Sequence, residues 1–226
     1  IYTNSDLKWI SDWAKVWKIS LSADKSRDIL FSEKSFSHNP NLFINAKIIK
    51  RVTVHKHLGL ILSTNLDWSY HVQYVCLRVQ RKLAVLRSIA CLQRRTLDLL
   101  YKIQVRSVID YALPVYWHTL RVAEKNRFEQ LQYKSAKIVT GALHLTSKEK
   151  LNLELGWESI AVRADILGLT LFHKTMIGQQ RPLISSCMPT IAPLTGHNTR
   201  HQRRFLSFPR GKVKISSSYF VLFTRK

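Results

Sequence analysis

Clustered cations are the residues of this chain whose type and spacing most clearly suggest a chemical role. They form two groups: Arg78, Arg81 and Lys82, and then Arg94, Arg95, Lys102 and Arg106. Cations on a helix face can contact phosphates along a nucleic-acid duplex, and such contacts position the duplex without reading its sequence. The competing interpretation is that both groups are solvated helix faces. Phosphate binding predicts an affinity that falls by roughly three orders of magnitude between 50 and 200 mM salt if about six phosphates are contacted.

Side chains that ligate metals or act as nucleophiles show no comparable clustering. No two of the 14 acidic residues are adjacent in the sequence. Four histidines are too dispersed to indicate a metal site: His55, His57, His71 and His118. The three cysteines include no CxxC pair: Cys76, Cys91 and Cys187. This pattern argues against a zinc site or a disulfide framework and fits a reducing intracellular setting.

The overall charge points to a polyanionic partner. The 226 residues carry 36 Lys+Arg against 14 Asp+Glu, a net charge of +22. Residues 1–67 contain 10 basic and 6 acidic side chains, residues 68–150 contain 15 and 5, and residues 151–226 contain 11 and 3. Nucleic acid is the expected partner, ahead of an anionic membrane surface. No membrane span is expected, because the most apolar run, residues 160–172, contains Arg163 and Asp165.

The first third of the chain predicts a short α+β segment. Residues 5–17 have helical spacing, and Trp9, Trp13 and Trp17 recur every fourth residue, which indicates core packing rather than a base-stacking surface. Residues 42–44 and 48–49 have hairpin spacing around Asn45 and Ala46. A type I′ turn needs a positive φ at both turn positions. Alanine there costs about 1–2 kcal/mol, so another turn type is expected.

Residues 54–62 predict a β element with Gly59 in its middle, where a missing side chain lets another backbone approach closely. A polar turn at residues 65–68 and a helix over residues 69–90 follow. The apolar stripe of this helix is Val72, Val75, Cys76, Val79, Leu83, Leu86 and Ile89.

The rest of the chain is predicted to be helical up to about residue 177. Thr96 is expected to cap a helix that carries Lys102 and Arg106 on one face. Pro114 interrupts it, and Tyr111, Tyr116 and Trp117 are expected to cluster around the break. A helix is predicted over residues 122–139, and Gly141 is expected to end it. A capping box at residues 146–149 predicts the start of another helix, and a further helix is predicted over residues 159–177. Residues 182–226 are predicted to be an irregular basic tail.

Several short motifs occur in a fixed order along the chain. Trp13 and Trp17 precede residues 21–26 and 31–32, and residues 56–59 and 66–68 with His71 come next. Further motifs are residues 108–112, 116–117, 131–132, 139–141, 154–157 and 171–174, with Gly178. The ordered set resembles the reverse transcriptases of non-LTR retrotransposons, and most of all those of jockey-like LINE elements.

The resemblance implies the C-terminal part of a polymerase. Residues 1–67 would be the end of the palm with its primer-grip hairpin, residues 68–150 a helical thumb, and residues 151–226 a C-terminal region. The implied fold class is α+β, with a small antiparallel β element before a mainly helical thumb. The family holds two Mg²⁺ on an Asp-Asp hairpin that this chain lacks, so the chain is expected to be a fragment, inactive alone and without a bound cofactor.

The resemblance also assigns roles to single residues. Lys25 matches a lysine placed to protonate the leaving pyrophosphate or offset its charge, a general-acid role, although a solvated lysine beside Asp24 and Asp28 is the alternative. Lys56, His57 and Gly59 match the primer grip, the alternative being a strand glycine at a bulge and a solvated histidine. Three positions depart from the usual family pattern: Ser22, Ala46 and the pair Arg163-Ala164.

Together these observations predict a reverse-transcriptase fragment that binds an RNA template and a DNA primer. The alternative is a non-catalytic RNA- or DNA-binding scaffold derived from such an element. The expected location is the nucleus and cytoplasm as a ribonucleoprotein, with the upstream palm and fingers of the same polyprotein as partners.

Overall fold

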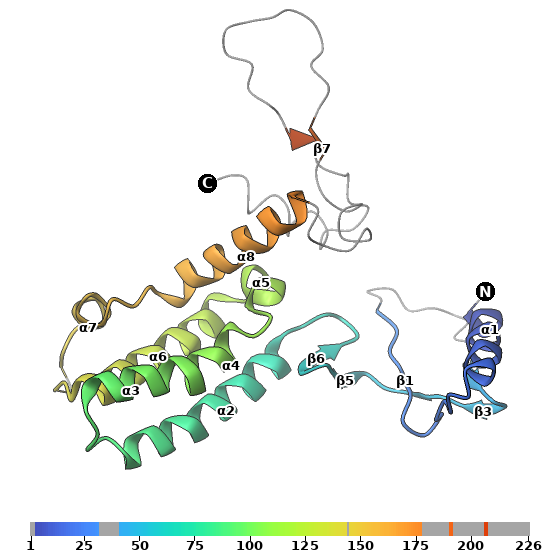
Figure 1. Ribbon diagram of the computed structural model, residues 1–226, viewed down its shortest axis with the longest axis horizontal. Helices are drawn as coiled ribbons and strands as arrows, with labels where there is room; N and C mark the ends of the chain where they lie inside the picture. Colours follow the sequence, from blue (N-terminus) through green and yellow to red (C-terminus); the bar gives the residue numbers. More distant parts are fainter. Residues whose placement is uncertain (1–2, 32–40, 144, 178–189, 192–205, 208–226) are drawn as a thin grey trace, which may run out of the picture. The chain divides into compact units, whose positions relative to one another are not determined.

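The computed structural model describes residues 3–31, 41–143, 145–177, 190–191 and 206–207. The chain divides into two compact units, residues 1–75 and 76–226, and the boundary falls inside one helix, α2 (Ser69–Ser88). Short strands occupy the first unit and helices dominate the second (Figure 1). The predicted α+β class is confirmed.

In its described residues the first unit combines one complete helix and the start of α2 with six short strands. They are α1 (Thr3–Val16), β1 (Arg27–Asp28), β2 (Phe43–Ile44), β3 (Lys47–Ile48), β4 (Lys50–Arg51), β5 (Val54–His57) and β6 (Leu60–Ser63). β2 pairs antiparallel with β3, and β5 with β6, whereas β1 and β4 form a parallel pair that the sequence did not predict. Ala23, Ile44 and Ile49 form a small buried core.

The tryptophans of α1 do not pack in that core, so this prediction was wrong. Trp9, Trp13 and Trp17 are 71%, 48% and 65% exposed, while Ser11 and Ala14 are buried. α1 packs against the short strand β2. A strand of two residues can cover only a narrow stripe of a helix, and small side chains allow close approach there. The large indole rings therefore remain outside the contact.

The β2–β3 turn also differs from its prediction. Asn45 and Ala46 have φ angles of 49° and 63°, so both occupy the left-handed region that a type I′ turn requires. A two-residue connection leaves few alternatives that preserve the strand twist. The strain at Ala46, about 1–2 kcal/mol, is offset by the burial of Ile44 and Ile49 on either side of the turn.

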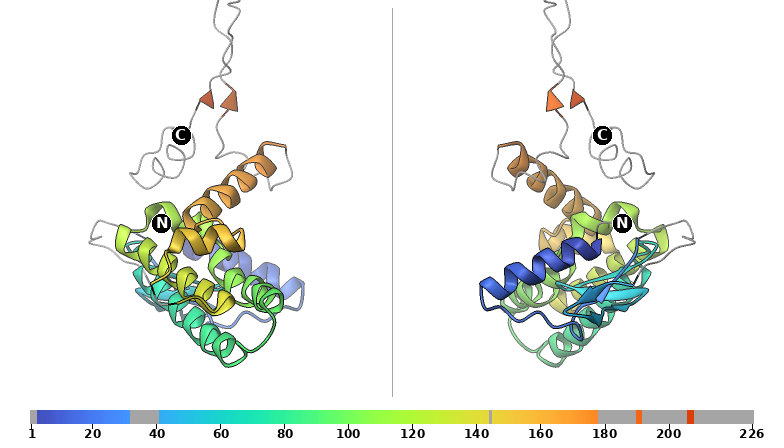
Figure 2. Two further views of the ribbon diagram at one scale, coloured as in Figure 1. Left: turned by 90° about the vertical axis from the view of Figure 1, so that its left-hand side faces the viewer. Right: turned by 90° about the vertical axis from the view of Figure 1, so that its right-hand side faces the viewer.

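The helices beyond α2 follow in close succession. They are α3 (Arg94–Leu100), the π-helical turn η1 (Tyr101–Arg106), α4 (Ser107–Asp110), α5 (Leu113–Tyr116), the 3-10 turn η2 (Trp117–Thr119), α6 (Val122–Thr140), α7 (Lys148–Leu155) and α8 (Ile160–Met176). α6 packs against α3, α7 and α8 (Figure 2). The buried stripe of α2 matches its prediction from Val72 to Leu86, and Ile89 is half-buried.

Helix ends follow the predicted signals with two shifts. Gly141 ends α6 at a φ of 67°, as predicted. The residue before α3 is Gln93 rather than Thr96, and α7 is capped by Ser147 rather than Thr146. Ser147 accepts a hydrogen bond from the Lys150 amide, which satisfies a free N–H group of the first turn.

The aromatic cluster next to Pro114, where the helical pattern is interrupted, does not contain all the residues that were predicted. Tyr116 and Trp117 are buried, and their rings lie 6.4 and 6.1 Å from that of Phe128 on α6. Tyr111 is exposed. Most of the predicted tail, residues 182–226, lies outside the described residues. Its described part consists of β7 (Thr190–Ile191) and β8 (Leu206–Ser207), which pair antiparallel.

Candidate nucleic-acid interface

The β5–β6 hairpin presents the predicted grip residues at its tip. His57 pairs with Leu60, which leaves Leu58 and Gly59 as the two turn residues, with φ angles of 46° and 87°. Gly59 is therefore a turn residue. The prediction that it lies in the middle of a β element was wrong. Glycine accepts positive φ without strain, and the sharp turn brings the backbone to the exposed end of the hairpin.

Lys56 is held beside the helix that follows the hairpin. Its Nζ donates a hydrogen bond of 2.8 Å to the Tyr74 hydroxyl and lies 4.6 Å from the centre of that ring. An ammonium group has three donors, so two remain for another acceptor. His57, next in sequence, is exposed. The tip thus combines an oriented cation with an exposed imidazole.

The polar turn after the hairpin fixes the start of α2. Asp67 accepts hydrogen bonds from the Ser69 amide and hydroxyl, at 3.1 and 2.8 Å. The Ser63 hydroxyl donates to the Asp67 carbonyl at 2.9 Å, which ties the end of β6 to the same turn. The carboxylate satisfies a free N–H group at the positive end of the helix.

His71 links the hairpin to α2 from within the protein. It is 1% exposed, its Nδ1 accepts a long hydrogen bond of 3.4 Å from the Ile61 amide, and its ring lies 6.0 Å edge-on from that of Trp68. Burial lowers the pKa of His71 from 6.5 to about 4. The side chain is therefore neutral at pH 7 and serves as a structural acceptor.

The first cationic group lies on α2. Arg78 and Arg81 are exposed, whereas Lys82 is half-buried and donates a 2.8 Å hydrogen bond to Gln104 on η1. Arg81 makes no hydrogen bond or ion pair with any other described residue. The three cations are therefore not equally available to a ligand.

Two of the four cations in the second group pair with acids. Arg94 pairs with Glu154 at 2.6 Å, and Lys102 pairs with Asp98 at 2.7 Å. Arg95 is exposed and makes no such pair within the described part of the chain.

Arg106 does not share an exposed face with Lys102, so this prediction was wrong. Its side chain is buried and lies 5.1 and 5.3 Å from the ring centres of Tyr101 and Trp157. Its Nε and Nη2 have no hydrogen-bond partner among the described residues. The wider π-helical turn at 101–106 changes the four-residue spacing on which the prediction relied.

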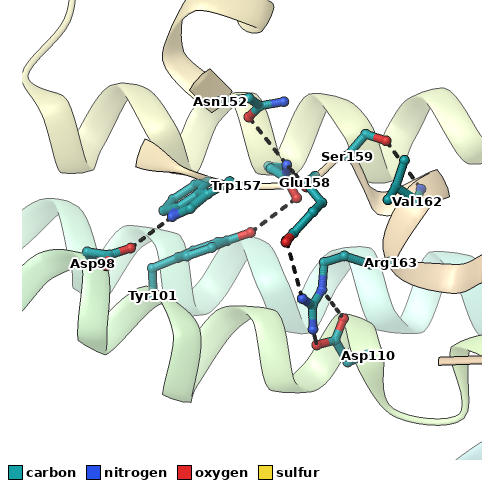
Figure 3. Close-up of polar contacts among 10 residues, drawn as sticks. Asp98, Tyr101, Asp110, Asn152, Trp157, Glu158, Ser159, Val162 and Arg163 are labelled. Carbon is teal, nitrogen blue, oxygen red and sulfur yellow. Dashed lines mark hydrogen bonds and ion pairs between the residues drawn. The ribbon is translucent and has the colours of Figure 1, made fainter. Parts of the chain in front are cut away.

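Motif residues of the second unit form an internal network (Figure 3). The indole ring of Trp157 stacks on Tyr101 at 3.9 Å, and its Nε1 donates to Asp98 at 2.8 Å. Gln132 is fully buried and donates to the Glu158 carbonyl at 2.9 Å and to Asn152 at 3.3 Å. These contacts join η1, α6 and α7 with the turn before α8.

Arg163 completes the network from α8. Its guanidinium makes two hydrogen bonds to the Asp110 carboxylate, one of them 3.1 Å long, and lies 3.7 Å from Glu158. These contacts raise the pKa of Arg163 above its usual range, chiefly through the hydrogen bond to Asp110. Sequence reasoning missed this structural role, although the motifs at residues 108–112, 131–132 and 154–157 all contribute to it.

Lys25 lies in an exposed turn, and its amide donates to the Ser22 hydroxyl at 3.4 Å. Nearby Asp28 is paired with Arg51 at 2.6 Å. No group of three or more potential metal ligands occurs among the described residues. The described residues therefore do not fit a two-Mg²⁺ site.

Comparison with known proteins identifies relatives among mobile elements. The chain is 26% identical over 135 residues to the RNA-directed DNA polymerase from mobile element jockey of Drosophila melanogaster, a match covering 58% of this chain and 14% of that protein. It is 25% identical over 149 residues to the probable RNA-directed DNA polymerase from transposon X-element of the same species, covering 64% and 16%. The jockey polymerase of Drosophila funebris is 25% identical over 135 residues, covering 58% and 14%.

The match therefore spans about one seventh of the length of these curated relatives. It confirms the resemblance to jockey-like non-LTR reverse transcriptases. No family model and no solved structure matches the chain. Within the described residues, every helix is too short or too polar to cross a bilayer.

Proposed function

We propose, from the premise that this chain is related to jockey-like reverse transcriptases, that it binds template–primer nucleic acid as the C-terminal part of such a polymerase. The hairpin tip is the observation that carries the proposal. Lys56 is oriented by Tyr74, His57 is exposed, and Gly59 brings the backbone close to the tip. A primer phosphate could accept from both side chains, and the missing side chain at Gly59 leaves room for the strand.

Cations of the second unit extend the proposal to the duplex. Arg81 and Arg95 are exposed and make no hydrogen bond or ion pair with another described residue, so phosphate contacts would replace only hydrogen bonds to water. Arg94 and Lys102 would have to leave surface ion pairs, which are each worth about 0–1 kcal/mol. Arg106 is buried, so the proposed phosphate contacts do not include it.

Nucleotide transfer is assigned to the full polymerase. Carboxylates outside this chain would hold Mg²⁺, and the palm and fingers of the same polyprotein would complete the site. Lys25 would assist only in that context. We place the full protein in the nucleus and cytoplasm, bound to its RNA template.

A salt titration tests the proposal. The chain is mixed with a labelled RNA–DNA template–primer, and binding is followed by fluorescence anisotropy between 50 and 200 mM salt. The variant Arg81→Gln/Arg95→Gln should bind more weakly, and the slope of log K against log salt should fall by about 2, because each lost phosphate contact removes about 0.9.

The variant Lys150→Gln/Lys174→Gln is the charge-matched control, since both lysines are exposed on α7 and α8. It should retain the wild-type slope. Equal slopes for all three proteins would contradict phosphate contacts at Arg81 and Arg95.

A further inference from the structure

A polar groove lies between α2 and α6, and its described lining includes none of the cations of the two predicted groups. Its volume is about 240 Å³, and buried Cys76 and Leu131 contribute to its apolar lining. Its polar lining residues are Gln80, Asn126, Arg127, Gln130 and Lys134. Gln80 lies one turn beyond Cys76 on α2, and the α6 residues recur at helical spacing, so each helix contributes one face.

The five polar side chains are exposed, and none forms a hydrogen bond or ion pair with another described side chain. Arg127 interacts only through its charge, which opposes the rise that burial causes in the pKa of the Cys76 thiol. In contrast, Arg94, Lys102 and Lys148 are each paired with an acid. The groove therefore gathers hydrogen-bonding capacity that the fold itself does not use.

The chemistry of the lining selects the class of ligand. Among the described residues that line the groove none is acidic, while Arg127 and Lys134 are cationic. This balance favours an anion over a metal ion or a basic segment. Arg127 and Lys134 are seven residues apart, which separates them by about 10 Å along the helix axis. That spacing suits an extended anion with more than one charge better than a single small ion.

The three carboxamides narrow the class further. A carboxamide donates and accepts at once, which matches base edges and the ribose 2′-hydroxyl. On an acidic peptide the side-chain carboxylates only accept and the backbone N–H groups are the main donors, whereas single-stranded RNA offers donors and acceptors on both its bases and its 2′-hydroxyls. The unpaired bases of a single strand expose these edges to side chains, whereas the Watson–Crick edges of a duplex are already paired.

We propose that the α2–α6 groove binds a single-stranded RNA segment, with Arg127 and Lys134 on phosphates and the carboxamides on base edges and 2′-hydroxyls. The proposal rests on the proposed function in one respect, that nucleic acid is the partner. It adds a second contact region, specific for a single strand, to the duplex contacts at Arg81 and Arg95.

The experiment uses the full chain with three labelled probes: oligouridine, the DNA oligomer of the same length, and the RNA–DNA template–primer. Arg127→Gln/Lys134→Gln should weaken oligouridine binding at least tenfold, and Lys150→Gln/Lys174→Gln should leave it unchanged. Gln130→Leu should reduce the preference for RNA over DNA. All substituted side chains are exposed, and thermal melting of each variant verifies that it folds.

Three results would overturn the proposal. The first is an equal loss of affinity for oligouridine in the groove variant and in the control variant. The second is equal affinity of the wild-type chain for the RNA and DNA oligomers, and the third is displacement of oligouridine by an acidic peptide but not by unlabelled RNA. If Arg81→Gln/Arg95→Gln leaves template–primer binding intact while the groove variant no longer binds oligouridine, the proposed function fails and this inference stands. If Arg81→Gln/Arg95→Gln weakens template–primer binding while the groove variant still binds oligouridine, only this inference is overturned.

Discussion

The hairpin at residues 54–63 and the helical network around Trp157 use motif residues in opposite ways. At the hairpin, Asp67 and His71 fix the base, and Lys56 and His57 remain accessible at the tip. In the network, Gln132, Trp157 and Arg163 are occupied by internal partners. A family motif can thus mark either a presented group or the framework that positions other groups, and only the contacts distinguish the two.

The largest expected loss of stability comes from removing the Trp157 side chain, which lies at the centre of the network. Trp157→Ala should lower the free energy of unfolding by about 3–5 kcal/mol, because a buried indole ring is lost and a cavity remains. Urea denaturation measures the change. Trp13→Ala is the matched control, since that indole is about half exposed and the expected change is within about 0.5 kcal/mol. Equal losses at both positions would mean that the exposed face of α1 is a packed surface.

An intermediate effect is expected at the base of the hairpin, where His71 has a pKa of about 4 instead of 6.5. The unfolded chain binds more protons than the folded one between these values, so stability falls as the pH drops from about 6.5 to 4. The loss should reach about 2–3 kcal/mol near pH 4. His71→Gln keeps an acceptor but does not titrate, so the stability of this variant, measured by urea denaturation at several pH values, should change less. An unchanged pH profile would contradict a buried neutral His71.

The smallest effect tests a local strain in the first unit. Ala46→Gly should raise the free energy of unfolding by about 0.5–1 kcal/mol, because glycine removes the penalty at a φ of 63° but loses more chain entropy on folding. Thermal melting provides the measurement, and Ala14→Gly, at a buried position within α1, should instead destabilise by about 1 kcal/mol. A lower melting temperature for Ala46→Gly would argue against the type I′ turn.

Periodicity predicted the helices well because each buried stripe is a local property of its own segment. α2 and α6 lie within a few residues of their predicted ends, and Gly141 ended its helix for a conformational reason visible in the sequence. The hairpin spacing at residues 42–49 correctly predicted the pairing of β2 with β3, because a two-residue connection leaves little freedom. Spacing did not reveal the second hairpin, since residues 54–62 were interpreted as one β element with Gly59 in its middle.

Predictions failed where the outcome depended on what lies opposite a residue. Trp9, Trp13 and Trp17 have the spacing of a buried stripe, but the partner strands are too short to cover them. Arg106 has the spacing of a surface cation, but the π-helical turn places it among aromatic rings. The α2–α6 groove gave no signal at all, because Gln80 and Arg127 are far apart in the chain.

By itself the sequence determined the charge, the helical segments, the hairpin at residues 42–49 and the order of motifs that led to the resemblance. Each of these depends on residues close together in the chain. The tertiary structure alone decided which cations are free, which are paired and which are buried, because pairing and burial depend on side chains brought together from distant segments. The same physical reason makes Arg163 part of the framework and leaves Arg127 and Lys134 available to a ligand.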